Sequence, residues 1–157
     1  MSQPGETPAA GVEGAGADHG ARSLLAAVNA MPIVRELGLR FPSVRPGEVE
    51  VAMPYQDRWS FRPGQFQATP VFAVADFAGV CAAGTLLPPG GSVSTVDCTL
   101  KLLAPAMGGV LRARGRVVKA GRMLTVSLVE VFGGDGDTLC ATALVTARNI
   151  PPGTGPG

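Results

Sequence analysis

A single carboxylate interrupts the longest apolar-rich stretch of the chain. Between Pro70 and Leu87, Asp76 is the only side chain that carries a charge at neutral pH. An isolated buried carboxylate is costly, so it must be partnered, partly solvated or shifted in pKa. Carboxyl groups in such settings are enriched at working sites. Asp76 is therefore the first candidate catalytic residue. The structural alternative is a loop cap or an ion pair with an arginine such as Arg62.

The chain lacks the residues that several other catalytic arrangements need. The only histidine, His19, lies near the N-terminus, outside the apolar part of the chain. This leaves no partner for a Cys–His pair or a Ser–His–Asp triad. Asp135 and Asp137 stand in a glycine-rich turn, where two carboxylates are too few ligands for calcium. We therefore expect neither a metal nor a cofactor.

The bulk composition narrows the possible partners and the location. The 157 residues include 13 Lys and Arg and 12 Asp and Glu, for a net charge of +1, so there is no basic surplus for binding nucleic acid. No segment has the pattern of a membrane span or of a secretory signal. An odd number of cysteines argues against a disulfide framework. We expect a cytoplasmic protein with three reduced thiols, mostly small core residues: Cys81, Cys98 and Cys140.

Turn residues and apolar periodicity place the elements that must position Asp76. Residues 66–86 contain no strong breaker before a Pro-Pro-Gly-Gly turn and are apolar nearly all round. This pattern predicts one long helix surrounded by protein. A shorter helix is expected to begin at Ser23, a candidate N-cap. Residues 39–44 and 48–53 are typical of two strands joined by a Pro-Gly turn.

Four more strands follow the long helix. Residues 93–103 alternate, which predicts one strand with these side chains on the same face: Val96, Cys98, Leu100 and Leu102. The next three segments are joined by short turns and must form an antiparallel meander: residues 110–119, 123–132 and 138–148. The first of them carries a basic strip, expected to be solvated, with a subunit contact or an anionic ligand as the alternative: Arg112, Arg114 and Arg116.

The elements together predict an α+β domain over residues 22–150, in which a curved antiparallel sheet wraps around one long central helix. Residues 1–21 are rich in Gly, Ala, Pro and Glu and have almost no large apolar side chain. They cannot bury enough surface to offset their ordering entropy, so we expect a disordered tail. Residues 151–157, rich in Pro and Gly, are expected to form a flexible end.

The segment from Gln67 to Asp76 resembles a catalytic stretch of a known family. Its sequence, QATPVFAVAD, is similar to the His-Gly-Gly…Asp stretch of hotdog thioesterases of the phenylacetate-degradation type, where the Asp also lies nine positions after the His. Further similarities follow in order over residues 64–150, including Thr95-Val96-Asp97 and Leu103-Ala104-Pro105-Ala106. The resemblance implies a hotdog fold, a homodimer or a dimer of dimers, and hydrolysis of an acyl-CoA thioester, with coenzyme A as part of the substrate.

The resemblance also implies roles for individual residues. Asp76 would activate a water molecule as a base or attack the thioester carbonyl directly. The backbone N–H of Ala68, alone or together with that of Thr69, would face the carbonyl oxygen from the start of the helix, where spare donors stabilise a developing oxyanion. Thr95 or the neighbouring Ser94 would supply a hydroxyl that positions the water. In the family, that hydroxyl comes from the other subunit.

The sequence departs from the family pattern at substrate-binding positions. Gln67 replaces the His, and Phe61 stands where an Asn or Gln often helps to place the substrate. Gln65 or Gln67 could take over that task, since an amide both donates and accepts. A basic turn is a further candidate, for the phosphates of coenzyme A: Lys119, Gly121 and Arg122. Two alternatives stay open, namely a non-catalytic hotdog module that binds acyl-CoA or acyl-carrier thioesters, and an assembly module.

Overall fold

The computed structural model describes residues 13–134 and 138–154. Its main sheet has six strands in the order β1-β2-β6-β7-β8-β5, and every neighbouring pair is antiparallel. These strands are β1 (Arg40–Arg45), β2 (Glu48–Pro54), β5 (Ser92–Leu102), β6 (Val110–Ala120), β7 (Leu124–Gly133) and β8 (Thr138–Ile150). The segment expected to be irregular forms a short 3-10 helix, η1 (Asp57–Trp59), and a small hairpin of β3 (Ser60–Arg62) and β4 (Gln65–Phe66).

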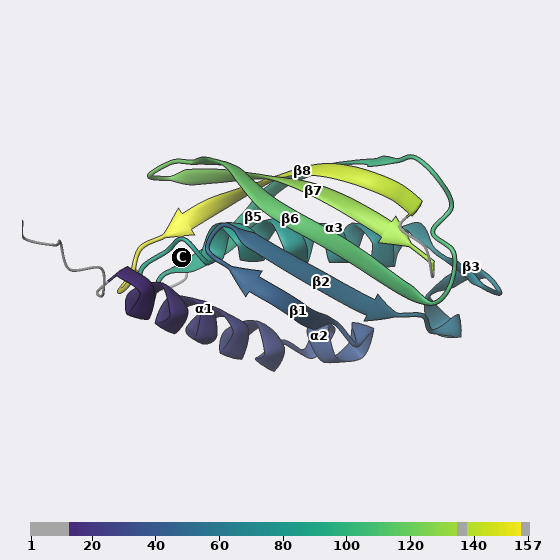
Figure 1. Ribbon diagram of the computed structural model, residues 1–157, viewed down its shortest axis with the longest axis horizontal. Helices are drawn as coiled ribbons and strands as arrows, with labels where there is room; N and C mark the ends of the chain where they lie inside the picture. Colours follow the sequence, from purple (N-terminus) through teal and green to yellow (C-terminus); the bar gives the residue numbers. More distant parts are fainter. Residues whose placement is uncertain (1–12, 135–137, 155–157) are drawn as a thin grey trace, which may run out of the picture.

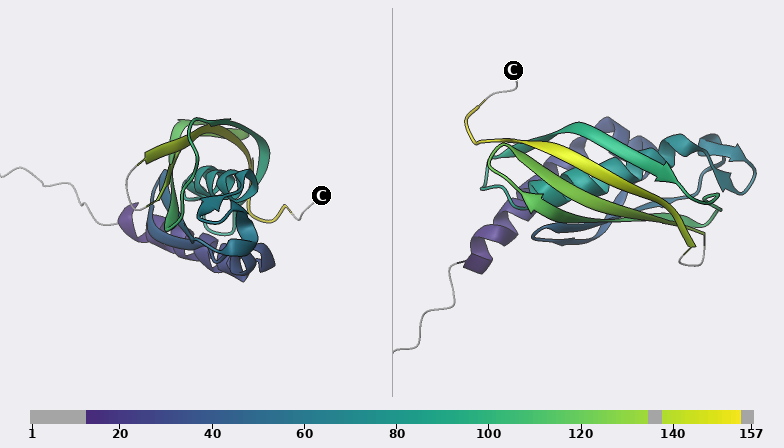
Figure 2. Two further views of the ribbon diagram at one scale, coloured as in Figure 1. Left: turned by 90° about the vertical axis from the view of Figure 1, so that its right-hand side faces the viewer. Right: turned by 90° about the horizontal axis from the view of Figure 1, so that it is seen from above.

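The long helix α3 (Ala68–Gly84) lies inside the curve of the sheet, and the strands arch around it when the molecule is viewed along its long axis (Figures 1 and 2). Its buried side chains recur at helical spacing and pack on the sheet to form the centre of the core: Val71, Val74, Ala75, Ala78, Cys81 and Ala82. The predicted α+β architecture is therefore confirmed.

Two further helices, α1 (Glu13–Ala30) and α2 (Pro32–Leu37), lie beside β1, at the opposite edge of the sheet from β5 (Figure 1). The first helix begins at Glu13, not at Ser23, so residues 13–21 are helical where we expected a disordered tail. Ala-rich sequence favours a helix, and the buried Gly20 packs close to the carbonyl of Leu87, just beyond α3. This docking is a tertiary contact that a local composition argument does not include.

The ends of the chain complete the description. Residues 151–154 are exposed and belong to no helix or strand. The rest of both expected tails, residues 1–12 and 155–157, lies outside the described residues, as do Asp135 and Asp137. Within the part of the chain that the structure describes, no helix is long and apolar enough to cross a membrane.

The strand β5 differs from its predicted alternation because it contains a β-bulge. Thr95 pairs with Ala147 and Asp97 with Thr146, so Val96 is the extra residue between them. Val96 is 59% exposed, so the prediction that it shares a face with Cys98 was wrong. Thr95 takes the core-facing position before the bulge and Cys98 the one after it, because residues paired directly across strands share a face and Ala147 and Val145 are buried.

The helix α3 approaches the middle of the sheet very closely at two glycines. A Cβ atom on Gly115 of β6 would lie 2.3 Å from the carbonyl oxygen of Ala78, and one on Gly79 would lie 2.6 Å from Val145. The buried Ser127 hydroxyl of β7 donates to the carbonyl of Gly79 at 2.9 Å. These contacts fix both the height and the rotation of α3 over the sheet.

The substitution Gly115→Ala tests this close approach. The new methyl group would overlap helix backbone, which cannot move like a side chain, so we expect a loss of about 2–3 kcal/mol in the free energy of unfolding. Arg116→Ala, on the outer face of the same strand, should change it by less than about 0.5 kcal/mol. Urea unfolding of both variants measures the difference. Equal stabilities would show that the helix and the sheet are not held at this distance.

Candidate active site

Asp76 lies on a flank of α3 that faces β5. The Thr95 hydroxyl donates a hydrogen bond of 2.9 Å to Asp76 Oδ1. The bulge at Val96 makes this contact possible, because it allows Thr95 and Cys98 to face the helix on either side of the extra residue. Asp76 has no ion pair among the described residues, so the alternative pairing with Arg62 is not found; the Arg62 Nε instead donates to Gln65.

The surroundings of Asp76 shift its acidity. Burial raises the pKa of the Asp76 carboxyl above its ordinary value, and the hydrogen bond from Thr95 partly opposes this rise. Two nearby thiols are held in their protonated form. Burial, together with the charge of Asp76, raises the pKa of Cys81 to about 12 and that of Cys98 to about 11. A raised carboxyl pKa suits a general base, whereas thiols of such high pKa are poor nucleophiles at neutral pH.

The carboxylate opens into an apolar groove. This Asp76 groove, of about 430 Å³, is formed by one flank of α3: Ala68, Thr69, Phe72, Ala73, Asp76 and Phe77. Phe72 is 44% exposed although the helix was predicted to be surrounded by protein. The described residues of the chain therefore leave this flank of α3 uncovered.

A second groove begins at the start of α3. This hairpin groove, of about 450 Å³, lies between α3, the β3–β4 hairpin and the segment after β5: Phe61, Gln65, Phe66, Gln67, Ala68, Val71 and residues 102–106. Tyr55 anchors the hairpin, since its hydroxyl accepts from the Gly64 N–H at 2.8 Å and its ring meets Phe66 edge to face. Ala68 lines both grooves, so they meet at the N-terminus of the helix.

Four backbone N–H groups at the start of an α-helix have no partner within it. In α3 these belong to residues 67–70, and Pro70 has no N–H. The N–H of Gln67 donates to the carbonyl of Trp59 at 3.0 Å, and that of Thr69 donates to the side-chain carbonyl of Gln67 itself. Ala68 alone keeps an N–H that donates to no other described residue. The free donor therefore lies where the two grooves meet.

The structure thus brings together most of the predicted site residues. Asp76, Thr95, Ala68, Thr69, Gln67, Gln65 and Phe61 lie in or beside the two connected grooves. Ser94 does not join them: it pairs with the exposed Arg148 and faces away from α3. The basic turn also lies elsewhere, because the β6–β7 hairpin that carries Lys119 and Arg122 is at the far end of the sheet from the start of α3 (Figure 1).

Sequence analysis missed two features that shape the site, one segment and one capping contact. The first is the segment from Leu102 to Ala106, which forms one wall of the hairpin groove. The sequence pattern that could have indicated this wall is a run of apolar residues with Pro105 directly after a strand, because a segment with Pro there leaves the sheet. The second is the side chain of Gln67, which caps the helix that it precedes. Gln is not among the preferred N-cap residues, so no pattern pointed to it.

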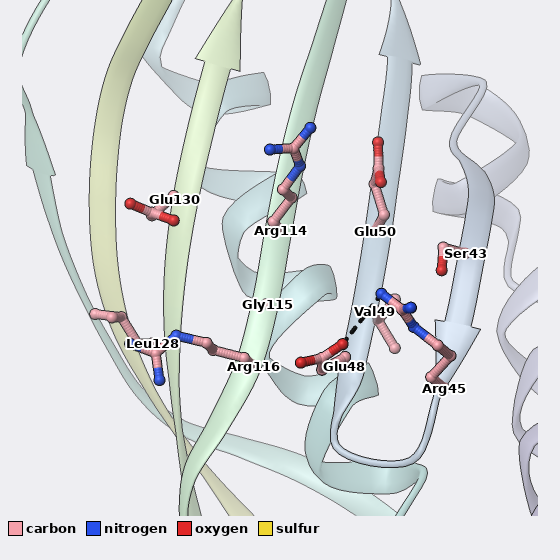
Figure 3. Close-up of a pocket in the computed structure, with 10 residues that line it drawn as sticks. All are labelled: Ser43, Arg45, Glu48, Val49, Glu50, Arg114, Gly115, Arg116, Leu128 and Glu130. Carbon is pink, nitrogen blue, oxygen red and sulfur yellow. Dashed lines mark ion pairs between the residues drawn. The ribbon is translucent and has the colours of Figure 1, made fainter. Parts of the chain in front are cut away.

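A third groove, of about 430 Å³, lies on the outer face of the sheet, away from α3 (Figure 3). Its walls carry charges of both signs on neighbouring strands: Arg45, Glu48, Glu50, Arg114, Arg116 and Glu130. Arg45 and Glu48 form an ion pair of 3.1 Å, and Arg114 stacks over the ring of Phe132. The lining of this groove therefore carries as many acidic as basic side chains, and the sheet separates it from Asp76.

Comparison with known proteins identifies the family. Residues 71–140 match the sequence model of the thioesterase superfamily. A thioesterase family protein from Silicibacter pomeroyi is 31% identical to this chain; the match covers 83% of this chain and 98% of that one, with a TM-score of 0.79. The chain belongs to the hotdog-fold thioesterase superfamily.

Two other solved structures resemble this thioesterase superfamily member. A phenylacetic acid degradation-related protein from Ralstonia eutropha is 28% identical, with 82% of this chain and 98% of that chain covered and a TM-score of 0.71. The PaaI protein of the E. coli phenylacetic acid degradation operon is 19% identical, with 87% and 97% covered and a TM-score of 0.77, which shows the fold alone. No protein with a curated description is significantly similar in sequence. The predicted family resemblance is confirmed.

The variant Thr95→Val tests how the site sets the acidity of Asp76. It removes the hydrogen bond that favours the ionised carboxylate and leaves the burial that disfavours it, so the pKa of Asp76 should rise further. Titration of the carboxyl carbon by ¹³C NMR measures the shift. Because a base must be ionised, the acid limb of any kcat/KM profile should move to higher pH by the same amount.

Thr99→Val is the matched control for this titration. The Thr99 hydroxyl belongs to the same strand but donates to Asp97 at 3.1 Å, so the titration of Asp76 should be unchanged. A pKa of Asp76 that stays the same or falls in Thr95→Val would contradict the proposed balance between burial and hydrogen bonding.

Proposed function

We propose that this thioesterase superfamily member hydrolyses acyl-CoA thioesters, with Asp76 as the catalytic carboxylate. The observation that carries the proposal is the position of Asp76: half-buried in an apolar groove, raised in pKa and oriented by Thr95. In the reaction, the carboxylate either takes a proton from the attacking water or attacks the carbonyl carbon itself. In the first route the C–S bond then breaks, and the coenzyme A thiolate leaves as the thiol with the proton that Asp76 took from the water. In the second route the C–S bond breaks to give a mixed anhydride with Asp76, water then hydrolyses this anhydride to the free acid, and that water supplies the proton of the thiol.

The spacing of the catalytic groups supports a site shared between two chains. Ala68 and Asp76 are eight positions apart on α3, and the helical rise of about 1.5 Å per residue separates them by about 12 Å. A thioester carbonyl and one intervening water span only about two hydrogen-bond lengths, roughly 6–7 Å. One carbonyl therefore cannot use both groups of a single helix. We propose that the Ala68 N–H of one copy works with Asp76 of its partner.

The exposed edge of the sheet supports the same assembly. Among the described residues, the strand β5 pairs with β8 alone, and it carries exposed apolar side chains, with Val96 at 59% and Leu102 at 56%. A long unpaired edge with apolar residues is a site for pairing with another chain. A partner at this edge would also lie next to the uncovered flank of α3 that carries Phe72 and Asp76. We propose a homodimer, or a dimer of such dimers.

The lining of the hairpin groove indicates the acyl part of the substrate. Its walls are mainly apolar, with aromatic rings at Phe61 and Phe66, and a volume of about 450 Å³ suits an aromatic or a medium aliphatic acyl group. Gln65 and Gln67 at its edge offer polar contacts. The basic turn at Lys119 and Arg122 is far from the start of α3 (Figure 1), so it stays a candidate contact only for the phosphates, which lie at the end of coenzyme A remote from the thioester. With three free thiols, we place this reaction in the cytoplasm.

The substitution Asp76→Asn tests the reaction. It keeps the size of the side chain and an oxygen that accepts from Thr95, but it cannot take up a proton. We expect kcat to fall at least about a hundredfold. The measurement is thiol release from acetyl-, medium-chain, long-chain and aryl-acyl-CoA, with wild type and variant side by side. Asp57→Asn, on the exposed 3-10 helix, is the control and should retain full activity.

Two results would contradict the proposal in different ways. An Asp76→Asn variant as fast as wild type would remove Asp76 from the mechanism. Saturable binding of acyl-CoA without thiol release by wild type would favour the non-catalytic module that binds acyl thioesters. The replacement of the family His and Gly-Gly by Gln67, Ala68 and Thr69 would then account for the loss of turnover.

A heterodimer tests the shared site. Ala68→Pro removes the free N–H without breaking the helix, because Pro is favoured at the first helical position and Gln67 before it is already extended, with φ −75° and ψ 161°. Homodimers of Ala68→Pro and of Asp76→Asn should both be inactive. A heterodimer with one chain of each kind contains one intact site and should recover about half of the wild-type turnover.

Differently tagged chains, purified over two affinity columns, provide this heterodimer. The control is the heterodimer of wild type with the double variant Ala68→Pro, Asp76→Asn. If each active site is shared between the two chains, this control contains no intact site. If each active site lies within one chain, the wild-type chain keeps one intact site. Activity in the control and none in the test heterodimer would place each complete site within a single chain.

A further inference from the structure

The side chain of Gln67 occupies one of the two backbone donors at the start of α3. Its amide oxygen accepts from the Thr69 N–H, which is one of the two donors that would face a substrate carbonyl. An amide oxygen and a thioester oxygen are both neutral sp² acceptors, and each seeks an N–H in the plane of its carbonyl group. In the free protein, Gln67 therefore satisfies Thr69 as a bound carbonyl would.

The backbone of Gln67 is fixed, whereas its side chain is free to move. The Gln67 N–H donates to the Trp59 carbonyl at 3.0 Å, which holds the residue at the head of the helix. The side chain is exposed and lines the hairpin groove, and Thr69 is its sole hydrogen-bond partner among the residues described. Rotation of its χ angles would release the Thr69 N–H without any movement of the helix.

We propose that Gln67 is an internal competitor for the substrate carbonyl, which must displace the amide oxygen to gain the second donor. This inference rests on the proposed function, and it assigns Gln67 as a positioning residue. Two observations support this. Of the N–H groups in the first turn of α3, that of Ala68 alone donates to no described residue, and the two grooves meet at Ala68. A carbonyl placed there would receive one donor at once and the other only in exchange for Gln67.

Two unreactive analogues separate binding of the carbonyl from binding of the remainder of acyl-CoA. In the ketone analogue a CH₂ group replaces the sulfur, so the carbonyl is kept. In the thioether analogue a CH₂ group replaces the carbonyl carbon and its oxygen. The Kd of each is measured by calorimetry for wild type and variants. The ratio of the two Kd values reports the contribution of the carbonyl to binding, because any effect of a variant on binding of the coenzyme A part is common to both analogues and cancels.

In Gln67→Ala the preference for the ketone, measured as the Kd of the thioether divided by the Kd of the ketone, should rise about fivefold above the wild-type value. This is the equilibrium factor that corresponds to a typical N-cap hydrogen bond. Gln67→Glu strengthens the cap, because a carboxylate at a helix N-terminus accepts more strongly, and should shift the ratio in the opposite direction. The Glu variant keeps the helix capped, so the test stands even where the Ala variant fails to fold.

Gln56→Ala is the matched control. Its amide also bonds to backbone, with Nε2 donating to the Leu37 carbonyl at 3.1 Å, but it lines neither of the two connected grooves. The ratio should therefore stay at the wild-type value. Equal effects of Gln67→Ala on both analogues, or none, would overturn the competitor role while leaving the thioesterase proposal intact. Failure of both analogues to bind any variant would overturn the proposed function and the competitor role with it.

Discussion

The close approach of α3 to the centre of the sheet is the contact on which the position of the site depends. Gly115 and Gly79 have no side chains in the way, and Ser127 joins the carbonyl of Gly79 to the sheet. Asp76 lies one helical turn before Gly79, so these contacts set the direction in which its side chain leaves the helix. A helix held further from the sheet, or turned about its axis, would move Asp76 away from Thr95.

Thr95 reaches the same point from the other side because of an irregularity in β5. In a regular strand, side chains alternate strictly, and a shift of one residue exchanges the two faces. The bulge at Val96 puts Thr95 and Cys98 on the core face, where Thr95 contacts Asp76. A buried carboxylate that accepts a hydrogen bond is less costly than an isolated one. The bulge thus lowers the cost of placing a charge beside the core.

Much of this arrangement could be predicted from the sequence because it follows from local patterns. The apolar run around Asp76 indicated α3, and alternating residues with turn signals indicated the meander. The bulge could not be predicted, since pairing with β8 decides which residue of β5 is extra. Nor could the start of α1, which depends on contact between Gly20 and the chain near Leu87. The eight-residue spacing of Ala68 and Asp76, by contrast, was readable from the sequence, because the helical rise is fixed.

The start of α3 shows how one helix can meet two requirements. Its N–H groups need acceptors in the free protein, since unpaired donors are costly, yet a thioesterase site needs those donors for the substrate. Pro70 removes one donor, and Gln67 and Trp59 satisfy two more. The Ala68 N–H stays open to the grooves. The sequence Gln67-Ala68-Thr69, at the position of the family His-Gly-Gly, therefore keeps the helix end stable without occupying every donor that the proposed reaction needs.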